Sequence, residues 1–175
     1  MGFRDKTSFS EVGIDYAHHE IHSGSHYFCT YAATVASAAT MRILVTTPNT
    51  QKRAHMLFRV NSTLLTTYKI FEENESVRVA ANALIARNND RNSPNTSGLT
   101  ISHTPTAGNN GDLIWEERFG TGTLPGNQGG GAGGFGRSDV EIILKQNTTY
   151  LYQITSGTNA NLVSVVMEWY EHTNK

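Results

Sequence analysis

The sequence predicts an all-β fold, an antiparallel β-sandwich or jelly-roll-like arrangement in a single domain. Short runs rich in Val, Ile, Tyr and Trp alternate with polar residues, as half-buried strands do. Turn residues separate these runs at intervals of about eight to twelve positions, which is typical of sandwiches and barrels. Strands do not alternate with long helical patterns, so a parallel α/β fold is not expected. A length of 175 residues fits one such domain.

The domain is expected to carry two appendages. Residues 1–16 mix aromatic and charged side chains and are predicted to form an N-terminal arm, so that the sandwich itself spans residues 17–175. Gly120–Gly136 is predicted to be a long glycine-rich loop, because it holds nine of the chain's sixteen glycines. Such a segment loses much backbone entropy on ordering. Both appendages are therefore expected to order against a partner, and removing Gly126–Gly136 is expected to weaken assembly without unfolding the domain.

The strands before the glycine-rich loop are predicted from the local alternation of apolar and polar residues. Met41–Thr47 and Ala54–Val60 are expected to pair as a hairpin across the turn at Pro48. Ala32–Ala39 is ambiguous between strand and loop. Val77–Arg87 is predicted to be a strand or bulged strand, although a helix competes there. The further expected elements are strands at Tyr27–Tyr31, Thr66–Phe71, Leu99–His103 and Leu113–Phe119, and a loop at Asn88–Gly98.

The last third of the chain is expected to seed the core. It contains three apolar runs, Val140–Lys145, Thr149–Thr155 and Leu162–Tyr170, which are separated by short polar turns. This spacing predicts an antiparallel meander of three strands. Side chains alternate along a strand. The side chains expected on one face of the last run are those of Val163, Val165, Met167 and Trp169.

Composition limits the classes of partner. The formal net charge is −1 and only 17% of the residues are charged, so no direct nucleic-acid contact is expected. The single cysteine, Cys29, excludes an internal disulfide and lies in an apolar run, which favours a buried structural cysteine over a catalytic thiol. No long apolar segment and no classical signal peptide are found, so no membrane partner is expected.

A cluster of histidines follows the predicted arm. His18, His22 and His26 share one face whether the segment is a strand or a helix. The spacing permits a zinc or nickel site. It lacks the HExxH order of catalytic metal helices, and an exposed histidine-rich edge is the favoured interpretation. We therefore assign no metal and no other cofactor to the chain.

The sequence carries no catalytic motif of the GxSxG, P-loop or SxxK type. A glycosidase would need two carboxyl groups facing each other in a cleft, and the acidic residues near the glycine-rich loop do not single out a pair. Trp115 and Trp169 are expected in the core and not on a sugar-binding platform, because each lies in an alternating apolar run. No catalytic residue is assigned, and the chain is predicted not to be an enzyme. The acidic residues in question are Asp112, Glu116, Glu117, Asp139 and Glu141.

Candidate contacts with a partner lie in the two appendages. Phe135 is the strongest candidate, because it is isolated among glycines and has no local apolar neighbour. Arg137 flanks the same loop and suits a carboxylate on a neighbouring subunit. The full set of candidate partner-contact residues is Phe3, Phe9, Gly126, Gly130, Phe135 and Arg137.

Two stretches and the glycine-rich loop between them resemble a known family. The stretches read LIARNNDRNSPNTSGLTISHTPT and EIILKQNTTYLYQITSGTNANLVSVVMEWYEHTNK, so the resemblance covers about Leu84 to Lys175. They are similar to a family of small β-proteins of tailed-bacteriophage virions that accompany the major capsid protein. The resemblance implies a head decoration, or cement, protein with a jelly roll or related β-fold, and it supplies no catalytic residues.

The expected function is that of a structural virion protein. The resemblance implies that it binds the shell of the major capsid protein, associates with itself as a dimer or trimer, and stabilises the phage head. It would be assembled in the host bacterial cytoplasm and reside on the head surface. Two alternatives stay open: a tail or fibre module with a receptor-binding or carbohydrate-binding β-sandwich, and a glycan hydrolase that uses Glu116 or Glu117.

Overall fold

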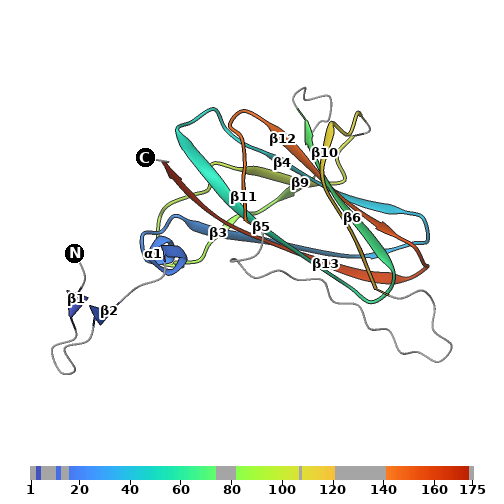
Figure 1. Ribbon diagram of the computed structural model, residues 1–175, viewed down its shortest axis with the longest axis horizontal. Helices are drawn as coiled ribbons and strands as arrows, with labels where there is room; N and C mark the ends of the chain where they lie inside the picture. Colours follow the sequence, from blue (N-terminus) through green and yellow to red (C-terminus); the bar gives the residue numbers. More distant parts are fainter. Residues whose placement is uncertain are drawn as a thin grey trace.

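The structure, a computed structural model, describes residues 3–4, 11–12, 16–73, 82–106, 108–120 and 141–173. Two antiparallel β-sheets pack against each other (Figure 1), which confirms the predicted all-β sandwich. In the described parts of the chain, no helix has the length and apolar character needed to cross a membrane. The elements are β1 (Phe3–Arg4), β2 (Glu11–Val12), α1 (Tyr16–His22), β3 (His26–Val35), β4 (Thr40–Thr46), β5 (Lys52–Ser62), β6 (Thr66–Glu73), β7 (Asn82–Leu84), β8 (Arg87–Asn88), β9 (Thr100–His103), β10 (Asp112–Phe119), β11 (Ile142–Ile143), β12 (Thr149–Ser156) and β13 (Asn161–Thr173).

The two layers have a nested strand order. One layer is a five-stranded sheet with the order β11-β5-β13-β3-β8, and the other is a six-stranded sheet with the order β10-β6-β12-β4-β9-β7. The pairs β3–β13, β4–β12, β5–β11 and β6–β10 lie within these sheets. The chain therefore pairs like one long hairpin that is wrapped around a core, which is the topology of a jelly roll.

The predicted meander at the end of the chain is wrong. β12 lies in the middle of the six-stranded sheet, between β4 and β6, whereas β13 lies in the middle of the five-stranded sheet. The side chains of Tyr150, Leu151 and Tyr152 are all buried, so both faces of β12 are covered. A strand that is covered on both faces suits the centre of a sheet, where it has a neighbour on each side. The neighbours of β12 are β4 and β6, and β13 is not among them. Of the first run, only Ile142–Ile143 among the described residues forms a strand, β11, which pairs with β5.

The predicted hairpin of Met41–Thr47 with Ala54–Val60 is also wrong. Both segments are strands, but β4 pairs with β12 and β9, while β5 pairs with β13 and β11. The turn after Thr47 therefore carries the chain from one sheet to the other. A short turn with Pro48 could join two strands of one sheet or carry the chain from one sheet to the other. The second connection forms, because β4 and β5 each bury side chains in a different layer.

The other local predictions are largely confirmed. The four remaining predicted strands lie within β3, β6, β9 and β10, extended or trimmed by a few residues, and a loop occupies most of Asn88–Gly98. Ala32–Val35 continues β3, and the chain then turns through Ala38, whose φ is 57°. In the predicted strand Val77–Arg87, residues 77–81 lie outside the described residues, and the described part contains β7 and the first residue of β8.

The core lies between the sheets and is rich in aromatic side chains. The ring of Phe58 stacks on those of Tyr152 and Tyr68, with centroid distances of 4.4 and 4.9 Å. Trp169 is fully buried and Trp115 packs partly buried against the same cluster, as predicted for both. Cys29 is buried there too, and its burial raises the pKa of the thiol to about 11. That thiol is a structural cysteine, because a reactive one needs a low pKa.

Candidate functional site

The candidate partner contacts fall mostly outside the described residues. Phe9, Gly126, Gly130, Phe135 and Arg137 all lie there. The backbone of Phe3 belongs to β1, which pairs with β2. The partner role of these six residues stays a prediction.

The histidine cluster is divided by the fold. His18 and His22 lie one turn apart on the exposed side of α1, with their Nε2 atoms 3.0 Å apart. His26 begins β3 and is buried, and its Nδ1 accepts a hydrogen bond from Asn89 Nδ2 at 2.6 Å. Among the residues that the structure describes, no three His, Cys, Asp or Glu side chains converge on a metal position. The three-histidine alternative is therefore not formed.

The carboxylates of the glycosidase alternative do not face each other. Glu116 and Glu117 are neighbours on β10, so they point to opposite faces of the six-stranded sheet. Glu116 forms an ion pair with Lys69 at 3.2 Å. Glu117 lies opposite Tyr68 on the core side, where burial raises the pKa of its carboxyl group. This pair cannot share one substrate as acid and base.

A row of aromatic and histidine side chains crosses the outer face of the five-stranded sheet next to α1. Tyr170 on β13 lies between His26 on β3 and His55 on β5, as the strand registers require. The His55 and Tyr170 rings stack with a centroid distance of 4.6 Å. Glu141 binds both of these residues through Oε1, at 2.7 Å from His55 Nδ1 and at 2.8 Å from the Tyr170 hydroxyl, which donates.

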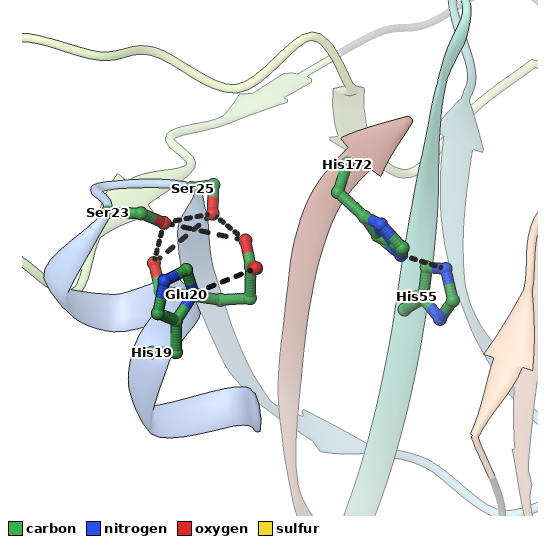
Figure 2. A network of polar contacts seen from close by, with 6 residues as sticks. All are labelled: His19, Glu20, Ser23, Ser25, His55 and His172. Carbon is green, nitrogen blue, oxygen red and sulfur yellow. Dashed lines mark hydrogen bonds and ion pairs between the residues drawn. The ribbon is translucent and has the colours of Figure 1, made fainter. Parts of the chain in front are cut away.

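His172 contacts His55 of this row, and Figure 2 shows the two imidazoles facing each other. His172 Nε2 lies 2.8 Å from His55 Nε2 on the neighbouring strand. Because His55 Nδ1 faces the Glu141 carboxylate, its proton belongs on Nδ1, and its Nε2 accepts from His172. Burial and the nearby His55 lower the pKa of His172, while Glu20 and Glu141 act in the opposite direction. The sequence gives no sign of this contact, because 117 positions separate the two histidines.

Glu20 fixes the junction between α1 and β3. Its carboxylate is buried and accepts hydrogen bonds from Ser25 Oγ and Ser23 Oγ, the latter at 3.5 Å. His19 Nδ1 lies 3.4 Å from the same carboxylate. Figure 2 shows these groups gathered at the end of the helix. The buried charge therefore has partners of its own, as burial of a carboxylate requires.

Farther along the outer face of the same sheet, the side chains become small and the surface is open. The registers place Ser164 between Ala32 and Asn61, and Leu162 beside Thr34. Leu162 is 58% exposed. These side chains line a shallow groove with a volume of about 590 Å³. Its described lining residues are Ala32, Ala33, Thr34, Asn61, Ser62, Thr63, Leu162, Val163 and Ser164.

The groove is neutral and its described lining holds neither an aromatic nor a charged side chain. Nearby on the same face, Arg59 and Glu168 form an ion pair with each other, so their charges are already matched. A surface of this composition offers apolar area and hydrogen-bonding groups such as Asn61 and Ser164. It suits a contact with another protein surface better than recognition of a charged ligand.

A second exposed apolar region lies at the edge of the other sheet. Leu113 and Ile114 on β10 are 48% and 41% exposed. β10 is an edge strand, and its pairing with β6 shifts register between Leu113 and Trp115. A register irregularity and charged side chains such as Arg118 are devices that discourage edge-to-edge pairing. The outer face of the five-stranded sheet is therefore the stronger candidate for a functional surface.

Comparison of the chain with protein-family models, with curated proteins and with solved structures found no match. The resemblance of Leu84 to Lys175 to the phage virion family thus stays a prediction from the sequence. The function must be argued from the topology and from the outer-face groove.

Proposed function

We propose that the chain is a structural virion protein that decorates the head of a tailed bacteriophage. In this proposal it binds the shell of the major capsid protein and stabilises it by burying surface, without catalysis and without a cofactor. The observation that carries the proposal is the groove around Leu162, a large apolar side chain that is 58% exposed. Burying such a side chain against a partner is favourable, because it removes apolar area from water.

The physical mechanism is the burial of apolar area at many equivalent positions. Burying the exposed part of Leu162 in the contact favours the free energy of binding by about 25 cal/mol for each Å² of apolar area removed from water. The surrounding Thr34, Asn61 and Ser164 would supply the polar contacts that an interface needs around its apolar centre. A single contact of this size is weak, but repetition over a symmetric shell makes weak contacts adequate.

Two further features support a structural role. The jelly-roll topology, which includes viral capsid domains among its many uses, is compatible with the expected family, although a fold alone does not fix a function. The neutral lining of the groove, in the part of the chain that the structure describes, and the low overall charge fit packing against protein better than binding to a nucleic acid. In the proposal the chain also contacts copies of itself as a dimer or trimer on the head surface, after assembly in the bacterial cytoplasm.

The test is binding to heads that have been separated from tails, taken from the cells that produce this chain. We expect a fixed copy number per head by quantitative mass spectrometry. Leu162→Glu and Ala32→Arg should each abolish binding, because they place a charge in a neutral apolar contact. Thr100→Arg is the matched control, since Thr100 is exposed on β9 in the other sheet. Absence of the chain from heads would refute the proposed function. Full binding of both groove variants would refute the proposed surface.

A tail or fibre module that binds a receptor or carbohydrate is the second candidate. The groove volume of about 590 Å³ favours it, because small-molecule sites commonly span about 300–1,000 Å³. The absence of an aromatic side chain from the described lining speaks against it, since such sites are mostly lined by hydrophobic and aromatic groups. Presence of the chain in purified tails and not in heads would support this candidate instead.

A glycan hydrolase has the least support, because Glu116 and Glu117 point to opposite faces of their sheet. Hydrolysis of cell-wall glycans by the purified chain, lost in Glu116→Gln or Glu117→Gln, would restore that function. Retention of any such activity in both variants would exclude these two carboxylates as its source.

A further inference from the structure

The exposed side of α1 holds two imidazoles in mutual contact. His18 and His22 are four residues apart, so one helical turn brings their side chains to the same side. Their Nε2 atoms lie 3.0 Å apart, and their ring centroids 4.8 Å apart with the planes inclined at 65°. Both side chains are exposed to solvent.

We propose that His18 and His22 form a two-histidine chelate for a divalent transition metal ion such as Zn²⁺ or Ni²⁺. Imidazole nitrogens bind Zn²⁺ at about 2.0–2.1 Å. Two such ligands at angles between about 90° and 109° stand roughly 2.9–3.4 Å apart. The observed separation of 3.0 Å falls in that interval, so the distance between the two Nε2 atoms already suits a shared metal ion.

The chemistry of the two rings favours a metal over their contact with each other. The contact is one hydrogen bond on an exposed surface, which contributes little to stability because water competes for both groups. Each neutral imidazole can carry its proton on Nδ1 and present a lone pair at Nε2. A metal ion then takes both lone pairs at once. Since no third His, Cys, Asp or Glu converges there among the described residues, the remaining positions would be filled by water.

The inference is independent of the proposed head-decoration function. Its direct consequence is local: α1 has only seven residues, and helices of that length are marginal without further support. A chelate across its last turn would hold that turn in helical geometry. Since protons compete with the metal for Nε2, binding should weaken as the solution is made more acidic.

The test is isothermal titration calorimetry of the full chain, freed of any affinity tag, with ZnCl₂ and with NiCl₂ near neutral pH. We expect one metal ion per chain. His18→Ala and His22→Ala should each weaken binding by about tenfold or more, because either change leaves a single ligand. Both positions are exposed and Ala is the better helix former, so neither variant is expected to unfold, which circular dichroism would check.

His19→Ala is the matched control. It removes one imidazole from the same helix, but His19 faces Glu20 and not the pair. It should bind the metal as the unchanged chain does. Equal binding by all of these proteins, or no binding by the unchanged chain, would overturn the inference.

Discussion

His55 Nε2 and His172 Nε2 lie 2.8 Å apart across the neighbouring strands β5 and β13. The contact is a hydrogen bond only while at least one of the two nitrogens is unprotonated, because two N–H groups cannot donate to each other. His55 is held on its other side by Glu141 at 2.7 Å. This hydrogen bond is therefore lost when both Nε2 atoms carry a proton, so the contact between β5 and β13 depends on pH.

The first prediction is that acid destabilises the protein through His172. Burial and His55 lower the pKa of His172 below its ordinary value of 6.5, so the unfolded chain binds more protons than the folded chain in this range. The stability that follows is fully present above about pH 6.5 and is lost as the pH falls through the folded pKa. Urea unfolding between about pH 8 and pH 5 should show the free energy of unfolding decreasing in that window.

His172→Gln should reduce the slope of that decrease, because it removes one of the groups that must take up a proton. His18→Gln is the control, since His18 is exposed on α1 and does not contact this cluster. An unchanged slope in His172→Gln would contradict the assignment.

The second prediction separates two buried tyrosines on β12. The Tyr150 hydroxyl donates to Glu72 Oε2 at 2.9 Å and accepts from the backbone N–H of Lys145 at 2.8 Å. The Tyr152 hydroxyl is buried without a hydrogen-bond partner among the described residues. Tyr150→Phe should therefore cost about 1–2 kcal/mol, while Tyr152→Phe should be neutral or stabilising.

Chemical denaturation of the two variants measures the difference, since both lose only one oxygen atom. A cost for Tyr152→Phe equal to that for Tyr150→Phe would mean that the Tyr152 hydroxyl has a partner in solution. Tyr152→Phe should also leave the stacking on Phe58 unchanged, because the ring is retained.

Strand positions could be predicted from this sequence because alternation is a local property. Thr66–Phe71 and Leu113–Phe119 lie inside β6 and β10, and burial alternates from Thr66 to Ile70 and from Trp115 to Phe119. Strand partners could not be predicted, because the choice depends on which faces are covered in the folded chain. β12 shows this: Leu151, on the side away from the main core, packs with Leu44 and Phe71 in a separate small cluster. A strand covered on both faces reads in sequence like any other apolar run.

The candidate surface was only partly accessible from the sequence. Leu162 reads as one residue of an apolar run, and its exposure follows from the pairing of Leu162 with Thr34 on the face that carries Ser164 and Ala32. The histidines were recognisable as metal ligands by type, but the end of α1 at His22 removes His26 from the set. This helix end is closed by side-chain contacts such as that of Ser25 with Glu20, which helix propensity does not describe.

The third prediction concerns the buried carboxylate of Glu171. It accepts hydrogen bonds from Trp169 Nε1 at 3.0 Å and from Ser97 Oγ at 2.6 Å, and the backbone N–H of Gly98 lies 3.0 and 3.1 Å from its two oxygens. Glu171→Ala would leave these donors without their acceptor and should cost about 3 kcal/mol of unfolding free energy. Glu168→Ala on the same strand is the control, because its ion pair with Arg59 is partly exposed and should contribute at most about 1 kcal/mol.

Amide hydrogen exchange gives the second readout for that variant. If Glu171 anchors the loop that precedes β9 to the five-stranded sheet, the N–H of Gly98 should exchange faster in Glu171→Ala. The centre of β13 should stay protected in that variant. A uniform loss of protection would instead mean that the whole sandwich depends on this carboxylate.

The fourth prediction tests whether the groove is free in solution. Leu162 and Val163 are neighbours on β13, but Leu162 is 58% exposed and Val163 is 2% exposed. Leu162→Ala removes more carbon atoms, yet it should change the free energy of unfolding by no more than about 0.5 kcal/mol, as is usual for exposed positions. Val163→Ala should cost about 2–3 kcal/mol, because it removes buried methyl groups and leaves a cavity.

Urea unfolding of both variants at several protein concentrations would check this. A small effect for Leu162→Ala at every concentration leaves the side chain available to a partner, as the proposed function requires. A cost for Leu162→Ala that matches Val163→Ala and grows with concentration would mean that another copy of the chain already covers the groove, because only association makes stability depend on concentration. A large cost that does not change with concentration would place the cover within the same chain and would remove the groove as a docking surface.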